Sequence, residues 1–199
     1  HLGNGVAVAG RDALPAALRA LAGRRVRVDL EATPAALVDA LRQGGAAVLP
    51  GEDPVRLPRA CKNPTEQQGA RDAQRKDAVA LARFLHWFAR EAPRGALSEV
   101  SAAARLLAFR QEVPGFAGES FPAISGAGEH GAIVHYRATV ESDRAIRPYE
   151  CFLIDSGGQY PEGTTDVTRT LWTGPGPAPA LLRERYTRVL QGHVALSVL

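Results

Sequence analysis

Two short segments near the carboxyl end of the chain constrain its fold more than any other feature. The run CFLID at 151–155 is apolar and then abruptly acidic, and TTDVTRTLW at 164–172 is rich in β-branched residues. Between them, SGGQYPEG supplies the glycines and the proline that are typical of a turn. We therefore expect a β-hairpin-like unit that carries one aspartate on each arm, Asp155 and Asp166.

The two aspartates of this unit form a candidate metal site. Opposed residues on antiparallel strands hold their Cβ atoms about 4.5 to 5.5 Å apart, close enough for two carboxylates to share a cation or a cation pair. Without a cation, like charges in that arrangement repel each other. The alternative is that Asp155 and Asp166 make local backbone hydrogen bonds, which is the commoner role of Asp beside Gly and Thr. The spacing alone leaves both roles open.

The preceding residues predict alternating helices and strands. VRVDL at 26–30 and AAVLP at 46–50 are strand candidates, and a helix with Thr33 as its N-cap should run between them to about Gln43. The segment GEDPVRLPRA at 51–60 is rich in proline and charge and is typical of a connection, so we place a domain boundary there. Taken together, these elements predict an α/β (α+β) fold class.

A long amphipathic helix is predicted after this connection, over 64–91. Asn63 is a good N-cap, Pro64 suits the first helical position, and Glu66 stands where a capping-box acid belongs. A second helix should begin at about Ser98 or Ser101 and end near 113. Two short strand candidates, FPAIS at 121–125 and AIVHY at 132–136, follow it.

Composition argues against several functional classes. The formal charge of +3 comes without a basic block, so nucleic acid is not expected as a partner, and no apolar run is long enough to cross a bilayer. Cys61 and Cys151 lack CxxC spacing, so we interpret them as small buried residues in a protein of a reducing, cytoplasmic location. The chain begins with His1, has no methionine and ends in an apolar helical pattern, so we expect it to be a piece of a longer protein.

Several segments in the same order resemble one known family. LIDSGGQYPEGTTDVTRT is similar to the first metal-ligand segment of the aminopeptidase P (Xaa-Pro aminopeptidase) group of the creatinase-like, or pita-bread, metallopeptidases, peptidase family M24. Three further segments resemble parts of that group. Its first catalytic-domain helix is similar to KNPTEQQGARDAQRKDAVALARFLHWF, and its next core segment is similar to SFPAISGAGEHGAIVHY. The helix after the hairpin is similar to RYTRVLQGHVALS. The resemblance implies that residues 59–199 are the first half of a pita-bread catalytic domain. Residues 1–58 would then be the C-terminal part of a creatinase-like N-terminal α/β domain plus a linker.

The resemblance implies a role for each candidate site residue. The positions of Asp155 and Asp166 match ligands of a centre of two divalent metal ions, and His135 matches a position that contacts substrate. Oxygen-dominated ligation favours Mn²⁺, with Zn²⁺ or Co²⁺ as alternatives. Family members complete the centre with a histidine and two glutamates from the second half of the domain. The piece alone is therefore expected to be inactive.

The implied activity is removal of the N-terminal residue from peptides that have a free N-terminus and proline second, by a metal-activated water. The alternatives are a prolidase, a methionine-aminopeptidase-like hydrolase, or a non-catalytic peptide-binding module on the same fold. A homodimer of the protein is also compatible with membership of this group. From the residues alone, His135 would be a satisfied core histidine, and the family position favours the substrate contact. His193 is interpreted as structural, His86 and His130 as surface or helix-face residues, and Glu162 as solvated.

Overall fold

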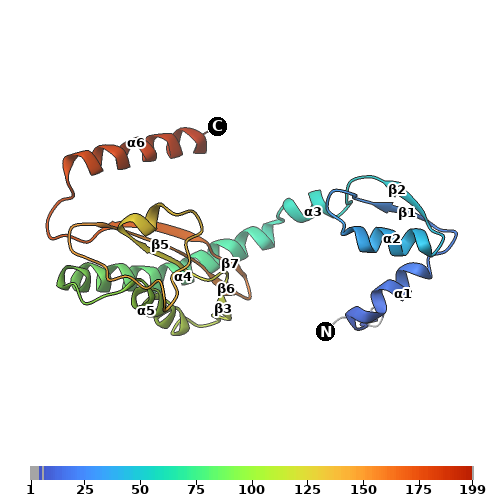
Figure 1. The fold of residues 1–199 in the computed structure, drawn as a ribbon, viewed down its shortest axis with the longest axis horizontal. Helices are drawn as coiled ribbons and strands as arrows, with labels where there is room; N and C mark the ends of the chain where they lie inside the picture. The colour runs from blue at the N-terminus through green and yellow to red at the C-terminus, as the bar shows by residue number, and fades with distance from the viewer. Residues whose placement is uncertain (1–4, 6, 199) are drawn as a thin grey trace. The chain divides into compact units, whose positions relative to one another are not determined.

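The computed structural model describes residue 5 and residues 7–198, and it divides into two compact units, residues 1–62 and residues 63–199 (Figure 1). Each unit has its own apolar core. None of the helices among the described residues is both long and apolar enough to cross a bilayer.

The first unit is a small parallel β-α-β arrangement. Its strands β1 (Arg25–Val28) and β2 (Ala47–Pro50) pair in parallel, and α2 (Ala35–Gln43) connects them. The remaining elements are η1 (Arg11–Ala13), α1 (Leu14–Arg19) and α3 (Arg56–Ala60). The predicted strands and helix are confirmed, but the predicted Thr33 cap is wrong. Pro34 occupies the N-cap position, and no side chain there makes a capping hydrogen bond.

The second unit begins with the predicted long helix. The helix α4 (Pro64–Glu91) starts in a capping box, in which the Asn63 side chain accepts from Glu66 N–H at 2.9 Å and the Glu66 carboxylate accepts from Asn63 N–H at 2.8 Å. A short η2 (Ala92–Arg94) ends at Gly95, whose φ of 70° lies in the left-handed region. The next helix, α5 (Glu99–Gln111), has Ser98 as its N-cap and confirms the second predicted helix.

Two small antiparallel sheets follow the helices. One has the strand order β4 (Ile124–Ala127), β5 (Cys151–Ser156), β8 (Val167–Trp172). The other has the order β3 (Gly118–Glu119), β6 (Gly158–Tyr160), β7 (Gly163–Thr164). The predicted pairing of the arms 151–155 and 164–172 is confirmed in the β5–β8 ladder. The connection between them is more than a turn, because β6 and β7 belong to the second sheet.

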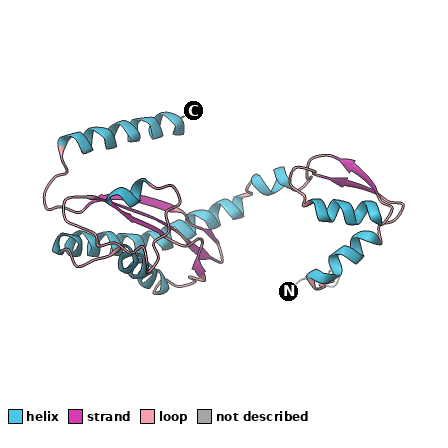
Figure 2. Ribbon diagram, viewed as in Figure 1, coloured by secondary structure: helices cyan, strands magenta, loops and turns pink. Residues whose placement is uncertain are grey.

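Strand β5 separates the core from an outer face of the sheet. Its even-numbered residues, Phe152, Ile154 and Ser156, are buried, and Phe88 of α4 stacks on Phe152 with ring centroids 4.7 Å apart. Figure 2 shows α4 and α5 on this side of the sheet, whereas α6 (Ala180–Ser197) lies on the other side. The two-residue period of a strand turns the odd-numbered residues away from that core. We call the surface formed by Cys151, Leu153, Asp155, Thr168, Thr170 and Trp172 the outer face.

Three further expectations from the sequence need correction. AIVHY is no strand: the 3-10 helix η3 (Gly128–Ala132) folds back from β4, and a turn follows. Gly126 permits this fold-back, because a Cβ there would lie 2.8 Å from the backbone nitrogen of Gly131. The strand expected at FPAIS begins only at Ile124. The cysteines are not buried, since Cys61 is exposed and Cys151 is partly exposed.

Candidate metal centre

Asp155 lies on β5 and points to the outer face. Its Oδ1 atom is buried and has no hydrogen-bond partner among the described residues. A buried carboxylate oxygen normally has a partner, because removing it from water is costly. The unmatched oxygen fits a role as a cation ligand, since a bound cation would satisfy it.

Asp166 immediately precedes β8, and the strand register fixes its relation to Asp155. The residue directly opposite Asp155 is Thr168, so the sequence-based expectation of two directly opposed aspartates is wrong. Asp166 is exposed and lies outside β8, two residues before Thr168, and the two-residue period of that strand, if continued, would carry it to the same outer face. Such diagonal pairs have Cα atoms about 7 to 8 Å apart, a separation that two carboxylates can bridge through a shared cation or a pair of cations.

The glycine pair after Asp155 sets the distance between the two aspartate segments. Thr165, the neighbour of Asp166, is fully buried, and its hydroxyl accepts from Gly158 N–H at 2.8 Å. The Thr165 N–H also donates to the Gly158 carbonyl at 2.9 Å. No Cβ could be accommodated at Gly157, because the Thr165 carbonyl occupies that space. These contacts hold the segment before Asp166 against the end of β5.

His135 and Asp155 line the same cavity on the outer face. This cavity of about 300 Å³ is bounded by Ile124 and Leu153, by Thr168, and by the segment 131–135. His135 itself is exposed and has a φ of 56°, a left-handed conformation that is uncommon for residues other than glycine. The structure therefore brings His135 and Asp155 together, although it places His135 in a turn instead of a strand.

The Cys151 thiol on the outer face is not activated as a nucleophile. Burial is the main cause that raises the pKa of the Cys151 thiol, which keeps it protonated. Among the described residues, no group of three or more His, Cys, Asp and Glu side chains is placed to hold a metal ion. Asp155 and Asp166 could thus supply hard anionic oxygens to a divalent ion, and further ligands would have to complete its coordination.

Sequence reasoning missed a buried carboxylate that contacts the segment carrying His135. Glu99 is fully buried at the start of α5, and His130 Nδ1 lies 2.9 Å from its Oε1 atom. His130, interpreted from the sequence as a surface or helix-face residue, is only 23% exposed in its side chain. No local pattern could have revealed this contact, because 31 residues separate the two partners.

The other singled-out residues lie away from Asp155 and its cavity. His86 is exposed on α4. His193 is exposed on α6 and does not line that cavity, but it lines a neighbouring groove that shares Thr168 with the cavity. Glu162 is not simply solvated, because it forms an ion pair with Lys76. The hydrogen bond from that lysine is the main cause that lowers the pKa of Glu162.

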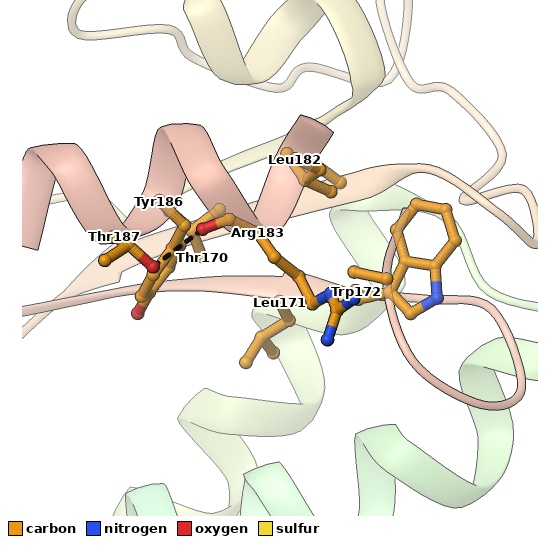
Figure 3. Close-up of a pocket in the computed structure, with 9 residues that line it drawn as sticks. Thr170, Leu171, Trp172, Leu182, Arg183, Tyr186 and Thr187 are labelled. Atoms are coloured by element: carbon orange, nitrogen blue, oxygen red, sulfur yellow. Dashed lines mark hydrogen bonds between the residues drawn. The ribbon is translucent and has the colours of Figure 1, made fainter. Parts of the chain in front are cut away.

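A second, apolar groove lies on the outer face between β8 and α6. Its volume is about 340 Å³, and Figure 3 shows Thr170 and Trp172 of β8 on one side with Leu182, Arg183 and Tyr186 of α6 on the other. The dashed line in Figure 3 is the hydrogen bond from Thr187 Oγ1 to the Arg183 carbonyl, 2.8 Å long. None of the described α6 residues is buried, so this helix leaves apolar side chains accessible.

Comparison with protein families identifies the class to which this fold and site belong. The model of metallopeptidase family M24 matches residues 68–197, which include both sheets, both aspartates and His135. The chain therefore belongs to metallopeptidase family M24, and its recognition from the sequence is confirmed.

Curated relatives within this family are aminopeptidases. The chain is 44% identical over 146 residues to aminopeptidase P2 of Arabidopsis thaliana, covering 73% of this chain and 20% of the relative. It is also 44% identical over 145 residues to Xaa-Pro aminopeptidase 2 of Sus scrofa, covering 72% and 21%. The chain thus spans about a fifth of the length of these relatives.

Solved structures of the same kind share the fold. An X-prolyl aminopeptidase from Caenorhabditis elegans, described as a cytosolic enzyme with a di-nuclear active site, matches with a TM-score of 0.72 at 28% identity. That match covers 83% of this chain and 28% of the other. An Xaa-Pro dipeptidase from Bacillus anthracis matches with a TM-score of 0.73 at 20% identity, covering 91% and 49%. The mixed α/β, pita-bread-like fold is therefore shown for part of the length of such structures.

Proposed function

We propose that the chain is part of an Xaa-Pro aminopeptidase that releases the N-terminal residue from peptides with proline in second position. In this proposal, residues 59–199 form the first half of the pita-bread catalytic domain, and residues 1–58 end a creatinase-like N-terminal domain. Support comes from the names of the relatives at 44% identity. The observation that carries the site is the buried, unpartnered Oδ1 of Asp155 beside His135.

Asp155 and Asp166 would each contribute carboxylate oxygens to a centre of two divalent ions. Two carboxylates on one sheet face repel each other, so binding cations there relieves an electrostatic cost. When bound, such ions activate a water and polarise the scissile carbonyl. Hard oxygen ligands favour Mn²⁺, and Zn²⁺ or Co²⁺ would also be accepted, because affinity order alone does not decide between them.

His135 would bind the substrate and not the metal. Its imidazole can donate a hydrogen bond to negative charge that develops on the substrate during attack. The left-handed turn carries it at the rim of the cavity, where a peptide can approach from solvent. The exposed apolar side chains of Ile133 and Val134 next to it suit an apolar neighbour such as a proline ring.

The test uses the full-length protein that contains this chain, purified, stripped of metal and reloaded with Mn²⁺. We expect it to cleave the first bond of an Xaa-Pro-Xaa tripeptide and to leave an Xaa-Pro dipeptide and a Met-Ala peptide intact. Cleavage of the dipeptide would favour a prolidase, cleavage of Met-Ala a methionine aminopeptidase, and binding without cleavage a peptide-binding module. We expect residues 1–199 alone to be inactive, because two carboxylates activate water poorly without further ligands.

The cellular setting is part of the same proposal. A cytoplasmic location rests on the two cysteines without CxxC spacing. Peptides are the proposed partners, together with a second copy of the protein in a homodimer. Fractionation of cells and the mass of the purified full-length protein in solution would test these two points.

A further inference from the structure

We infer that Glu99 is a positioning residue that holds His135 in place at the cavity. The inference rests on the proposed function only in that it takes His135 to contact the substrate. Glu99 itself does not line the cavity, so it would act through the segment 127–136.

One buried carboxylate binds that segment at three points. Glu99 accepts hydrogen bonds from Ala127 N–H at 2.7 Å and from the Tyr136 hydroxyl at 2.9 Å. His130 Nδ1 lies 2.9 Å from the same carboxylate and donates to it in the tautomer that carries hydrogen on Nδ1. Three donors from the segment converge on one buried carboxylate, so these contacts together fix the segment firmly.

The three contacts enclose His135 along the chain. Ala127 ends β4, His130 lies on η3, and Tyr136 immediately follows His135. The imidazole of His130 also packs on the ring of Tyr136, with centroids 4.4 Å apart. Burial is the main cause that raises the pKa of Tyr136, so its hydroxyl stays protonated and able to donate.

Apolar packing gives the turn itself little support. Ile133 and Val134 are 52% and 82% exposed, and His135 is exposed with a φ of 56°. A non-glycine residue in this conformation is held there by its surroundings. The Tyr136 hydroxyl also lies 3.3 Å from Ser142 Oγ, a longer contact than the one to Glu99. A backbone hydrogen bond from Tyr136 N–H to the Ile133 carbonyl, 3.2 Å long, closes the turn, and we assign the restraint that ties this turn to the core to the Glu99 carboxylate.

The consequence concerns the geometry of His135 relative to Asp155. The segment 131–135 forms one wall of the cavity, and Asp155 and Thr168 form another. A displacement of the segment by about 1 Å can lower turnover by about two orders of magnitude, because catalytic groups must be placed accurately. Glu99 would thus affect the reaction without touching the substrate or the metal ions.

The experiment replaces Glu99 by glutamine in the full-length, metal-loaded protein. The amide keeps the volume but carries no negative charge, and its NH₂ group would meet the Tyr136 hydroxyl, which must then turn from donor to acceptor. The contacts that hold the segment are therefore weakened without a change of side-chain size. We expect kcat for an Xaa-Pro-Xaa peptide to fall about 10- to 100-fold while KM changes less than about threefold and metal content stays the same. Glu129→Gln is the matched control, because Glu129 lies on η3 with its side chain 75% exposed. It should behave like the wild type.

A double-mutant cycle separates positioning from general destabilisation. If Glu99 acts through His135, the substitution Glu99→Gln should cause little further loss of kcat in a His135→Ala background. Equal losses in both backgrounds would overturn the inference. Tyr136→Phe removes a single hydroxyl and serves if Glu99→Gln does not fold. It should lower kcat severalfold, and a wild-type kcat for that variant would equally overturn the inference.

A readout independent of activity distinguishes failure of this inference from failure of the proposed function. The imidazole ¹H–¹⁵N signals of His135 should shift or broaden in Glu99→Gln and remain unchanged in Glu129→Gln. If the wild type cleaves none of the peptides, the proposed function fails, and these signals still decide the positioning role. Unchanged His135 signals in Glu99→Gln would refute that role whatever the activity.

Discussion

The carbonyl oxygen of Thr165 occupies the space that a side chain at Gly157 would need. Gly157 follows the end of β5 and Thr165 precedes Asp166, so this contact sets how closely the two aspartate segments approach. Gly157 is thus required by close backbone packing and not only by the need for a turn.

Replacement of Gly157 by alanine should destabilise the second unit by about 1 to 3 kcal/mol, because the new methyl group meets a backbone carbonyl that cannot rotate away. Trp87 and Trp172 are the only tryptophans of the chain, and both lie in this unit, so fluorescence-monitored urea unfolding reports on it. Gly192→Ala on α6 is the control. Nothing lies within 4 Å of that position, and the change should stabilise the helix by up to about 1 kcal/mol. A Gly157→Ala protein as stable as the wild type would contradict the packing argument.

A buried ion pair connects the two long helices of the second unit. Asp77 accepts from Arg110 Nε at 2.8 Å and from Arg110 Nη2 at 2.9 Å, and both side chains are almost fully buried. Arg110→Met should cost about 3 to 5 kcal/mol in free energy of unfolding, since it leaves a buried carboxylate without its cation. The exposed pair of Arg75 and Asp72 provides the comparison, and Arg75→Met should cost less than about 1 kcal/mol. Equal effects in urea unfolding would show that burial does not govern the Asp77 pair.

Tyr160 predicts how stability changes at alkaline pH. Burial is the main cause that raises its pKa, and its hydrogen bond to Asp77 Oδ1 at 2.9 Å adds to the effect. The unfolded chain therefore loses this proton first, near pH 10, while the folded state retains it. Stability is fully present below about pH 10 and falls above it, by up to about 1.4 kcal/mol per pH unit.

Urea unfolding between pH 9 and 11 tests this dependence. Tyr160→Phe should show a shallower loss of stability with pH than the wild type, because its folded and unfolded states no longer differ at that site. Tyr186→Phe, at a position that is 54% exposed, should keep the wild-type slope. The same slope in all three proteins would rule out Tyr160 as the source.

The parts of the fold that the sequence predicted depend on local chemistry. The helix over 64–91 was predictable because Asn63, Pro64 and Glu66 satisfy one another within a single turn. The β5–β8 pairing was predictable because a β-branched run faces an apolar one across a turn. Its register was not, because β6 and β7 form a separate sheet inside the connection and shift the partner of Asp155 to Thr168.

Contacts between distant segments account for the errors. The run AIVHY has the composition of a strand, but Gly126 and Gly131 let η3 fold back onto β4. Glu99 could not be recognised from its neighbours, since its partners Ala127 and Tyr136 are 28 and 37 residues away. The aspartates and His135 were given their proposed roles through the family resemblance of their segments, because the spacing of the aspartates alone left the local-turn role open.

The conformation of His135 predicts a difference between two substitutions that both delete the imidazole. At a φ of 56°, alanine pays the steric cost of a left-handed residue and glycine does not. His135→Gly should therefore be about 1 kcal/mol more stable than His135→Ala in urea unfolding, although both should lose activity to the same extent in the full-length protein. An alanine variant at least as stable as the glycine variant would show that the turn relaxes without the histidine.

Metal content should separate the role of the aspartates from that of His135. Asp155→Asn and Asp166→Asn keep the side-chain volume but remove the charge that offsets the cations, so the full-length protein should lose bound metal and turnover together. His135→Ala should keep its metal and still lose about 10²- to 10³-fold in kcat, as expected for an oxyanion donor. Asp72→Asn, at a partly exposed position of α4, is the control and should change neither quantity. Elemental analysis after dialysis measures the first quantity and cleavage of an Xaa-Pro-Xaa peptide the second. Full metal content in both Asp155→Asn and Asp166→Asn would show that these residues are not metal ligands. Near wild-type turnover in His135→Ala would show that this histidine has a structural role only.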